Sequence, residues 1–250
     1  MELIVLGSGT SFPVPDRGLP GYAVRAGGTT LLLDCGAGTH RQLAKAGMRL
    51  QDVDAILVSH RHLDHVSDLP QILFTLAIPR FGRTAPLLVI GPPGMRDYVE
   101  DLARVNAPWL DRPPYGLEVR DLLDARATVG PVEVEAREVV HTKPSVAYRL
   151  GFEGRTLVYS GDVGECPQIV EAARGADLLL LECAQPDHEP IESHLTPTRC
   201  GRIAAAARPA HLVLTHFYPA VLETDIVGAV RRAGYSGPLT LATDLARFVI

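Results

Sequence analysis

One stretch constrains this chain more than any other, the motif H-R-H-L-D-H at residues 60–65. It follows an apolar run at 55–58 that reads as a buried strand, and it precedes a segment at 67–78 that reads as a helix. Neutral imidazole and carboxylate groups are the ligands that zinc-type ions take where no thiolate is offered. Because packing seldom brings four such side chains into one loop, the motif predicts a metal site.

The spacing within this motif predicts two ions. His60 and His62 stand two residues apart at the end of an extended segment, so their side chains can point to the same side. Asp64 and His65 follow after the chain has begun to turn, so they would face a displaced point. Each zinc-type ion takes about four ligands, and we therefore expect further His or Asp ligands at the ends of later strands.

Three residues meet this expectation, because each follows an apolar strand directly or within two residues. A bridging carboxylate would hold two like-charged ions about 3.5–4 Å apart and leave room for a shared water. The predicted ligands are His60, His62 and His141 for the first ion, Asp64, His65 and His216 for the second, and Asp162 for both.

Composition sets the broad class. The chain has 250 residues, of which 46% are hydrophobic and 21% charged, as in an ordinary soluble globular protein. No composition break or linker divides it, so we predict a single domain over 1–250. The formal net charge of −5 gives no electrostatic footprint for long nucleic acids, whose binding depends on cationic side chains.

The cysteines and the N-terminal segment indicate the cellular compartment of the protein. Four cysteines are scattered without a C-x-x-C pair, which indicates buried thiols rather than a redox motif or a zinc ribbon. The first residues enter a strand at once, without a signal-type segment, and no apolar stretch reaches the length of a membrane span. We therefore predict a cytoplasmic protein that does not bind membranes.

The strand pattern predicts an α/β architecture. Strands and the helices that follow them form two blocks, roughly Glu2–Val105 and Leu117–Ile250. Layered packing of two such blocks gives two facing sheets with helices outside. The strand ends that carry the expected ligands would then converge on one edge.

This arrangement resembles the metallo-β-lactamase superfamily over nearly the whole chain. The resemblance implies a four-layer αβ/βα sandwich of two facing mixed sheets with outer helices and a dinuclear site at one edge. It is carried by Asp34 in D-C-G-A-G, the motif at 60–65, His141, Asp162 in S-G-D, and His216 in L-T-H-F. Because Asp34 ends a strand beside the proposed site, we expect it to hold a liganding histidine or its loop in place.

Within the superfamily, the chain is most similar to the phosphodiesterase branch of ribonuclease Z and small cyclic-phosphate phosphodiesterases. The opening L-G-S-G-T-S with Pro13 and Arg17 points there, as do the segment from His141 into 145–149 and Glu182 followed by H-L-T at 194–196. The resemblance implies that Glu182 and His194 support catalysis beside the metals.

Two further roles complete the predicted site. Asp64, which can touch both water and metal, is expected to orient the nucleophile. Ser145 and Arg17 are candidates for contact with the substrate.

One departure from ribonuclease Z bears on the substrate. Ribonuclease Z carries a long arm that grips tRNA between the positions of His141 and Asp162, where this chain has a short hairpin. We therefore predict hydrolysis of a small or cyclic phosphodiester by a metal-bridging hydroxide, with nucleic acid possible as a partner but not favoured. The implied cofactors are two divalent ions, Zn²⁺ first, with Mn²⁺ or Fe²⁺ as alternatives.

Other functions stay open at this point. The alternatives are a ribonuclease Z-like endonuclease that acts on RNA 3′ ends without the arm, and a lactone, thioester or lactam hydrolase that uses the same site. The flavodiiron redox branch is disfavoured because its motif replaces the second histidine with an acidic residue. A homodimer is the default expectation for the assembly.

Overall fold

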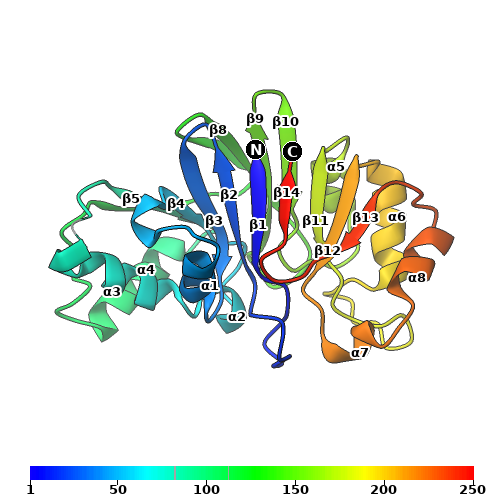
Figure 1. Cartoon of the computed structure of the whole chain (residues 1–250), viewed down its shortest axis with the longest axis horizontal. Helices are drawn as coiled ribbons and strands as arrows, with labels where there is room; N and C mark the ends of the chain where they lie inside the picture. Colours follow the sequence, from blue (N-terminus) through cyan, green and yellow to red (C-terminus); the bar gives the residue numbers. More distant parts are fainter. Residues whose placement is uncertain (82, 112) are drawn as a thin grey trace.

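The fold is described by a computed structural model that covers residues 1–81, 83–111 and 113–250. Two seven-stranded sheets face each other, and helices lie on both outer sides (Figure 1). The predicted α/β sandwich with two facing mixed sheets and outer helices is confirmed.

The first sheet has the strand order β14-β1-β2-β3-β4-β5-β6. Its strands run antiparallel from β14 to β3 and parallel from β3 to β6. In the parallel part, Leu33 pairs with Leu57, which pairs with Ile90, so β3 and β4 end side by side. The strands are β1 (Glu2–Gly7), β2 (Gly21–Ala26), β3 (Thr29–Cys35), β4 (Ala55–Leu57), β5 (Leu87–Gly91), β6 (Leu117–Asp121) and β14 (Arg247–Val249).

The second sheet has the order β13-β12-β11-β10-β9-β8-β7. It is parallel from β10 to β13 and antiparallel from β7 to β10, so β8 and β10 run in the same direction. The strands are β7 (Ala125–Val129), β8 (Val132–Glu138), β9 (Val146–Phe152), β10 (Arg155–Tyr159), β11 (Leu178–Glu182), β12 (His211–Thr215) and β13 (Leu239–Leu241).

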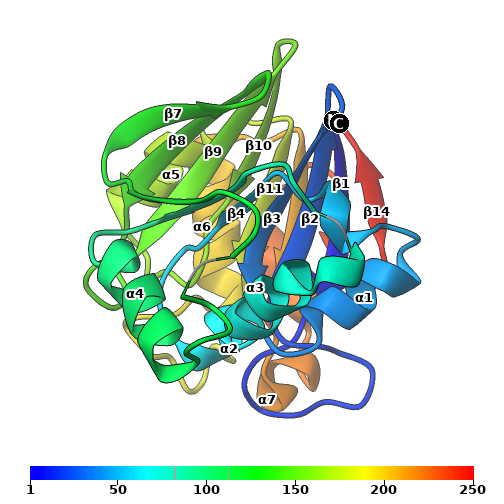
Figure 2. The ribbon, with the colours of Figure 1, turned by 90° about the vertical axis from the view of Figure 1, so that its left-hand side faces the viewer.

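Helices cover the two outer faces. Helices α1, α3 and α4 lie beside the first sheet, and α5, α6 and α8 lie beside the second (Figures 1 and 2). The α-helices are α1 (Thr39–Lys45), α2 (Leu63–Val66), α3 (Leu69–Ala77), α4 (Met95–Val105), α5 (Pro167–Ala173), α6 (Pro197–Ala207), α7 (Pro219–Leu222) and α8 (Ile226–Arg232), with 3₁₀ turns at η1 (Leu50–Asp52) and η2 (Pro79–Phe81).

Strand β3 shows why the apolar runs become central strands. Leu31 and Leu33 pack into the layer between the sheets, whereas Leu32 packs into the layer beneath the helices. A strand that is buried on both faces must be apolar at every position. A third apolar layer, which includes Leu179 and Ile203, joins the second sheet to its helices.

The division of the strands between the sheets corrects the prediction at two places. Strand β6 was expected in the second block, but it extends the first sheet beside β5, to which α4 connects it by a parallel crossover. Strand β14 returns from the end of the chain to pair with β1. The prediction also omitted β7, a short strand with only one buried residue.

Three smaller predictions have different outcomes. All four cysteines are buried free thiols, as expected. In the described part of the chain, no helix is both long enough and apolar enough to cross a membrane. The single domain over 1–250 and the cytoplasmic location stay predictions.

Candidate metal centre

The predicted ligands converge on one edge of the sandwich because they follow strands that run in the same direction. Asp34 lies near the end of β3, and the motif at 60–65 follows β4. On the second sheet, His141, Asp162 and His216 follow β8, β10 and β12. Strand β8 ends at Glu138, so His141 stands three residues beyond it rather than directly after it.

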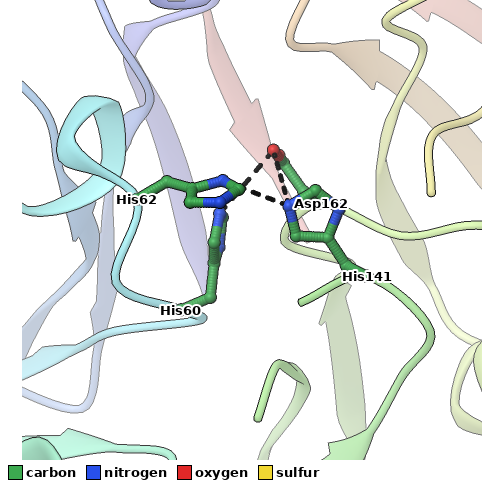
Figure 3. Close-up of side chains that lie close together, drawn as sticks. All are labelled: His60, His62, His141 and Asp162. Carbon is green, nitrogen blue, oxygen red and sulfur yellow. Dashed lines mark hydrogen bonds and ion pairs between the residues drawn. The ribbon is translucent and has the colours of Figure 1, made fainter. Parts of the chain in front are cut away.

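The first group of ligands surrounds one point. Figure 3 shows His60, His62, His141 and Asp162 with their side chains directed toward one another. One donor atom from each of the four lies within 4.8 Å of the others. His141 Nε2 is 3.2 Å from His62 Nδ1, and Asp162 Oδ2 is 3.7 Å from both His60 Nε2 and His141 Nε2.

The second group lies beside the first. Asp64, His65 and His216 also bring one donor atom each within 4.8 Å of one another. His65 Nε2 is 3.3 Å from His216 Nε2. Asp64 Oδ2 is 3.6 Å from His216 Nε2 and 3.8 Å from His65 Nε2.

Asp162 connects the two groups through different oxygens. Its Oδ2 faces His60 and His141, whereas its Oδ1 is 3.2 Å from His65 Nε2 and 3.3 Å from His216 Nε2. Metal–ligand bonds of about 2.0–2.1 Å in a tetrahedron place the ligand atoms roughly 3.3–3.5 Å apart. The observed spacings are close to that value on both sides of this carboxylate.

The protein alone does not satisfy these atoms. Among the described residues, His60 Nε2 and Asp162 Oδ1, which both face the other ligands, are buried without a hydrogen-bond partner. Buried polar atoms normally have one. The ring nitrogens of His62 and His141 are 3.2 Å apart, and those of His65 and His216 are 3.3 Å apart. Two ring nitrogens this close repel each other unless a proton or a cation lies between them. The donor set therefore fits divalent metal ions, in keeping with the prediction from the motif.

The charge states of His60 and Asp162 suit cations. Burial, with the nearby His65, lowers the pKa of His60 well below its usual value, which keeps its imidazole neutral. Burial alone would raise the pKa of Asp162, but His216, His65 and His60 outweigh it and hold that pKa well below the usual range. A neutral imidazole and an ionised carboxylate are the forms that bind metal. Burial lowers the pKa of His65, but Asp162 and Asp34 outweigh burial and raise that pKa well above its usual value, so a metal at its Nε2 would displace a proton.

Three histidines are oriented by hydrogen bonds from the ring nitrogen that faces away from the centre. His65 Nδ1 donates to Asp34 Oδ2 at 2.7 Å, and His141 Nδ1 donates to the Ser193 carbonyl at 2.9 Å. His60 Nδ1 lies 3.1 Å from Ser59 Oγ. Such contacts fix the tautomer and leave the other nitrogen's lone pair for a metal.

Asp34 anchors this orientation from the floor of the site. Its carboxylate accepts from the Ser59 N–H and the Ser59 hydroxyl, both at 2.7 Å, and from the Tyr159 hydroxyl, in addition to His65. The expected contact between Asp34 and a liganding histidine is therefore present. Ser59 and Tyr159 were missed by sequence reasoning. Ser59 had a weak signal as the residue before the motif, whereas Tyr159 had none.

The backbone near the site is held in unusual conformations. Asp34 and His216 have φ of 55° and 60°, which is costly for residues with a side chain. At Gly36, an added Cβ would lie 2.0 Å from the Asp64 carbonyl, so this glycine allows α2 to pack against the loop after β3. The positions of Asp64 and His65 depend on that close approach.

A second hydrogen-bonded pair, Glu182 and His194, stands beside the ligands. Glu182 Oε1 accepts from His194 Nδ1 at 2.9 Å and from the Val163 N–H at 2.8 Å, and Oε2 accepts from the backbone N–H groups of Ala184 and Leu195. The His194 ring centroid is 4.9 Å from that of His141. His194 thus presents its Nε2 on the side of the metal ligands.

The charge on His194 follows from this contact. Burial lowers its pKa, but the hydrogen bond and the negative charge of Glu182 outweigh burial and raise the pKa to about 9. In the protein as described, His194 is therefore a cation near neutral pH.

The two candidate substrate contacts are engaged within the protein. Arg17 Nη1 donates to Ser8 Oγ at 2.7 Å and to the Ala242 carbonyl at 2.6 Å, and its guanidinium lies 4.9 Å from the centroid of the Phe217 ring. Ser145 is buried, and its hydroxyl donates to the Thr142 carbonyl at 2.6 Å. Both contacts hold loops at the edge of the site, and substrate contact stays a prediction.

The remaining histidines lie outside the two groups. His40 Nδ1 donates to Asp68 Oδ2 at 2.7 Å, and His211 Nε2 lies 2.9 Å from Thr240 Oγ1. His188 is exposed on the loop after β11. These are ordinary environments for histidine.

Replacing Asp34 by Asn is expected to weaken metal binding about 10- to 100-fold, because an amide cannot hold His65 Nδ1 as a carboxylate does. Metal affinity is measured by titration with a chromophoric chelator, and thermal unfolding shows whether the fold is intact. Asp54→Asn is the matched control, since Asp54 accepts from the Thr30 N–H at the far end of β3. Wild-type affinity in a folded Asp34 variant would remove this positioning role.

Comparisons with known proteins find related sequences and folds. A family model described as Beta-lactamase superfamily domain matches residues 29–217, which include every predicted ligand. Ribonuclease Z of Mycobacterium marinum is 31% identical, and the match covers 99% of this chain and 98% of that protein. The short form of human tRNase Z (ELAC1) superimposes with a TM-score of 0.81 at 25% identity, covering 100% of this chain and 99% of that one. The metallo-beta-lactamase fold protein YhfI from Bacillus subtilis has a TM-score of 0.86 at 22% identity, covering 99% and 98%.

Proposed function

This chain belongs to the β-lactamase superfamily and is a metal-dependent hydrolase, and from that premise we propose that it cleaves a small or cyclic phosphodiester. The observation that carries the proposal is Asp162, whose two oxygens face two separate groups of ligands beside the Glu182–His194 pair. Two divalent ions, Zn²⁺ first and Mn²⁺ or Fe²⁺ as alternatives, would be held by the seven predicted ligands. When bound, such ions lower the pKa of water and neutralise charge on phosphate oxygens.

Each residue of the site has a role in this proposal. Asp64, whose Oδ2 faces His65 and His216, would orient the attacking water. His194 Nε2 donates a proton to the leaving oxygen, and Glu182 holds the ring in the required tautomer through Nδ1. Because Glu182 is buried and accepts three backbone N–H groups, its position is rigid.

The relatives support phosphodiester chemistry. The short hairpin and the charge of this chain support a small substrate. The relatives above include a ribonuclease and a tRNase by name, and those enzymes cleave phosphodiester bonds. Here, however, β9 and β10 are joined only by Glu153 and Gly154, which leaves no arm between His141 and Asp162 to hold an RNA. The net charge of −5 also disfavours a long polyanion.

An RNA 3′-end endonuclease is the second candidate, since 31% identity to a ribonuclease Z extends over nearly the whole chain. Such an enzyme could borrow a surface from a second copy in a homodimer. Hydrolysis of a lactone, thioester or lactam is a third use of the same site. The thiolate of a thioester leaves without a proton, but the alkoxide of a lactone and the amine of a lactam need a proton donor, so the Glu182–His194 pair argues only mildly against this use.

A substrate panel separates these functions. The Zn²⁺- or Mn²⁺-loaded protein is assayed with bis-p-nitrophenyl phosphate, cyclic nucleotides, precursor tRNA, a lactone, a lactam and a thioester. We expect metal-dependent turnover of the small phosphodiesters that chelation abolishes and metal restores. Turnover confined to precursor tRNA would contradict the proposal of a small substrate and favour an RNA endonuclease. Turnover confined to the lactone, the lactam and the thioester would contradict phosphodiesterase chemistry.

A further inference from the structure

His216 differs from other histidines of the metal centre in how its ring is held. His60, His65 and His141 each have a hydrogen-bonding group at the ring nitrogen that faces away from the centre. His216 presents Nε2 to Asp162, and its Nδ1 is buried without a hydrogen-bond partner in the described part of the chain. The direction of this ring therefore depends on the backbone that carries it.

The backbone at His216 is strained, and contacts hold the residues on both sides of it. His216 has a φ of 60°, a left-handed conformation that persists in a residue with a side chain only where the surroundings fix it. The Thr215 hydroxyl, just before this ligand, lies 2.9 Å from the Tyr22 hydroxyl of the first sheet. The Phe217 N–H, just after it, donates to the Ser8 carbonyl at 3.1 Å. The loop after β1 thus contributes directly to the conformation at this ligand.

Ser8 is itself fixed by the carboxylate of Asp244. Asp244 Oδ1 accepts from the Ser8 N–H at 2.9 Å and from the Ser8 hydroxyl at 2.8 Å. Asp244 Oδ2 accepts from the Gly18 N–H at 2.7 Å and from Gln42 Nε2 at 2.9 Å. One side chain therefore joins both ends of the loop between β1 and β2 to helix α1.

Arg17 extends this network to Phe217. Its Nη1 donates to Ser8 Oγ at 2.7 Å and to the Ala242 carbonyl at 2.6 Å, and its guanidinium lies 4.9 Å from the centroid of the Phe217 ring. Ser8 Oγ accepts from Arg17 while its own proton goes to Asp244. We call Ser8, Arg17 and Asp244 the loop clamp.

The loop clamp connects the two sheets. Asp244 lies on the connection between β13 of the second sheet and β14 of the first (Figure 1). Ser8 follows β1 of the first sheet, and His216 follows β12 of the second. The second group of ligands also combines segments that follow different sheets, since Asp64 and His65 come after β4. The clamp therefore ties together the two sides of this group.

We propose that the loop clamp positions His216 and so sets the affinity of the second metal position, with Asp244 as its central positioning residue. This inference rests on the proposed two-ion site. The first position does not depend on the clamp, because its histidine from the second sheet, His141, is oriented by the Ser193 carbonyl. Loosening the clamp allows the His216 backbone to relax and withdraws one ligand from the second position.

Asp244→Asn tests this role, because an amide places N–H donors where the carboxylate accepts from four groups. Stepwise affinities for Zn²⁺ are measured by competition with a chromophoric chelator. We expect two affinities in the wild type, of which the variant keeps one and weakens the other about tenfold or more. Ser8→Ala should act in the same direction with a smaller fold-change. At limiting metal, anomalous scattering should place the ion of the variant beside His60, His62 and His141.

Asp177→Asn is the matched control. Asp177 accepts from the Arg155 guanidinium and from the Thr156 N–H at the start of β10, the end of that strand opposite to Asp162. This control should keep both affinities. Thermal unfolding checks that the variants are folded, and Ser8→Ala decides the question if Asp244→Asn does not fold.

The outcomes separate the clamp from the metal site itself. Two wild-type affinities in the folded clamp variants, or a loss that is equal at both positions or confined to the first, overturns the inference while leaving the two-ion site intact. A wild-type protein that binds no more than one ion overturns the two-ion site and the inference with it.

Discussion

Replacing Asp162 by Ala is expected to lower metal-dependent turnover by on the order of 10³-fold or more and to reduce metal binding at both positions. The reason is that each of its oxygens faces a different group of histidines, so the variant loses one ligand from each group. The variant also removes the carboxylate oxygen that faces both His65 Nε2 and His216 Nε2, which lie 3.3 Å from each other. Turnover of bis-p-nitrophenyl phosphate and metal content after desalting measure the two effects.

Asp101→Ala is the matched control for this substitution. Asp101 lies on α4, is exposed and pairs with Arg104, so its loss should leave both metal content and turnover near the wild-type values. Asp162→Asn keeps the size of the side chain but removes its charge. Comparing it with Asp162→Ala separates the effect of the lost charge from the effect of the cavity. If a folded Asp162→Ala protein retained two ions, the bridging role would be wrong.

Replacing His194 by Ala is expected to lower kcat about 10²- to 10⁴-fold while metal content stays at the wild-type level. His194 donates through Nδ1 to Glu182, which leaves Nε2 as the proton donor toward the leaving oxygen. The loss should be large for a diester with an alkoxide leaving group. It should be small for p-nitrophenolate, which departs without needing a proton.

His188→Ala is the control, because His188 is an exposed histidine on the same loop. Glu182→Gln should reproduce part of the His194 effect with the same dependence on leaving group, and the double variant should lose little more than His194→Ala alone. An equal loss for both leaving groups would assign His194 to positioning the substrate rather than to proton transfer.

Much of the site could be predicted because its residues lie just after the ends of apolar strands. The motif at 60–65 and the later residues His141, Asp162 and His216 all follow apolar runs. Strands of this fold that share a direction end at one edge, so residues after them meet without any knowledge of side-chain packing. The same apolar runs predicted most strands, because strands buried on both faces have a strong sequence signal.

The features that were missed depend on contacts between distant segments. Strand β14 pairs with β1 across almost the whole chain length, and a short, half-exposed segment gives no sign of its partner. The contact of Tyr159 with Asp34 exists only because the two sheets face each other. The hydrogen bond of Arg17 to the Ala242 carbonyl likewise joins segments far apart in the sequence, and the contact of Arg17 with substrate stays a prediction.

The most direct test of the central claim is the metal content of the protein, reconstituted with Zn²⁺ or Mn²⁺, desalted, and analysed together with the anomalous scattering of its crystals. Seven ligands in two groups that share Asp162 predict about two ions per chain, one beside His60, His62 and His141 and the other beside Asp64, His65 and His216. Fewer than one ion per chain, or an ion bound away from these residues, would contradict the account.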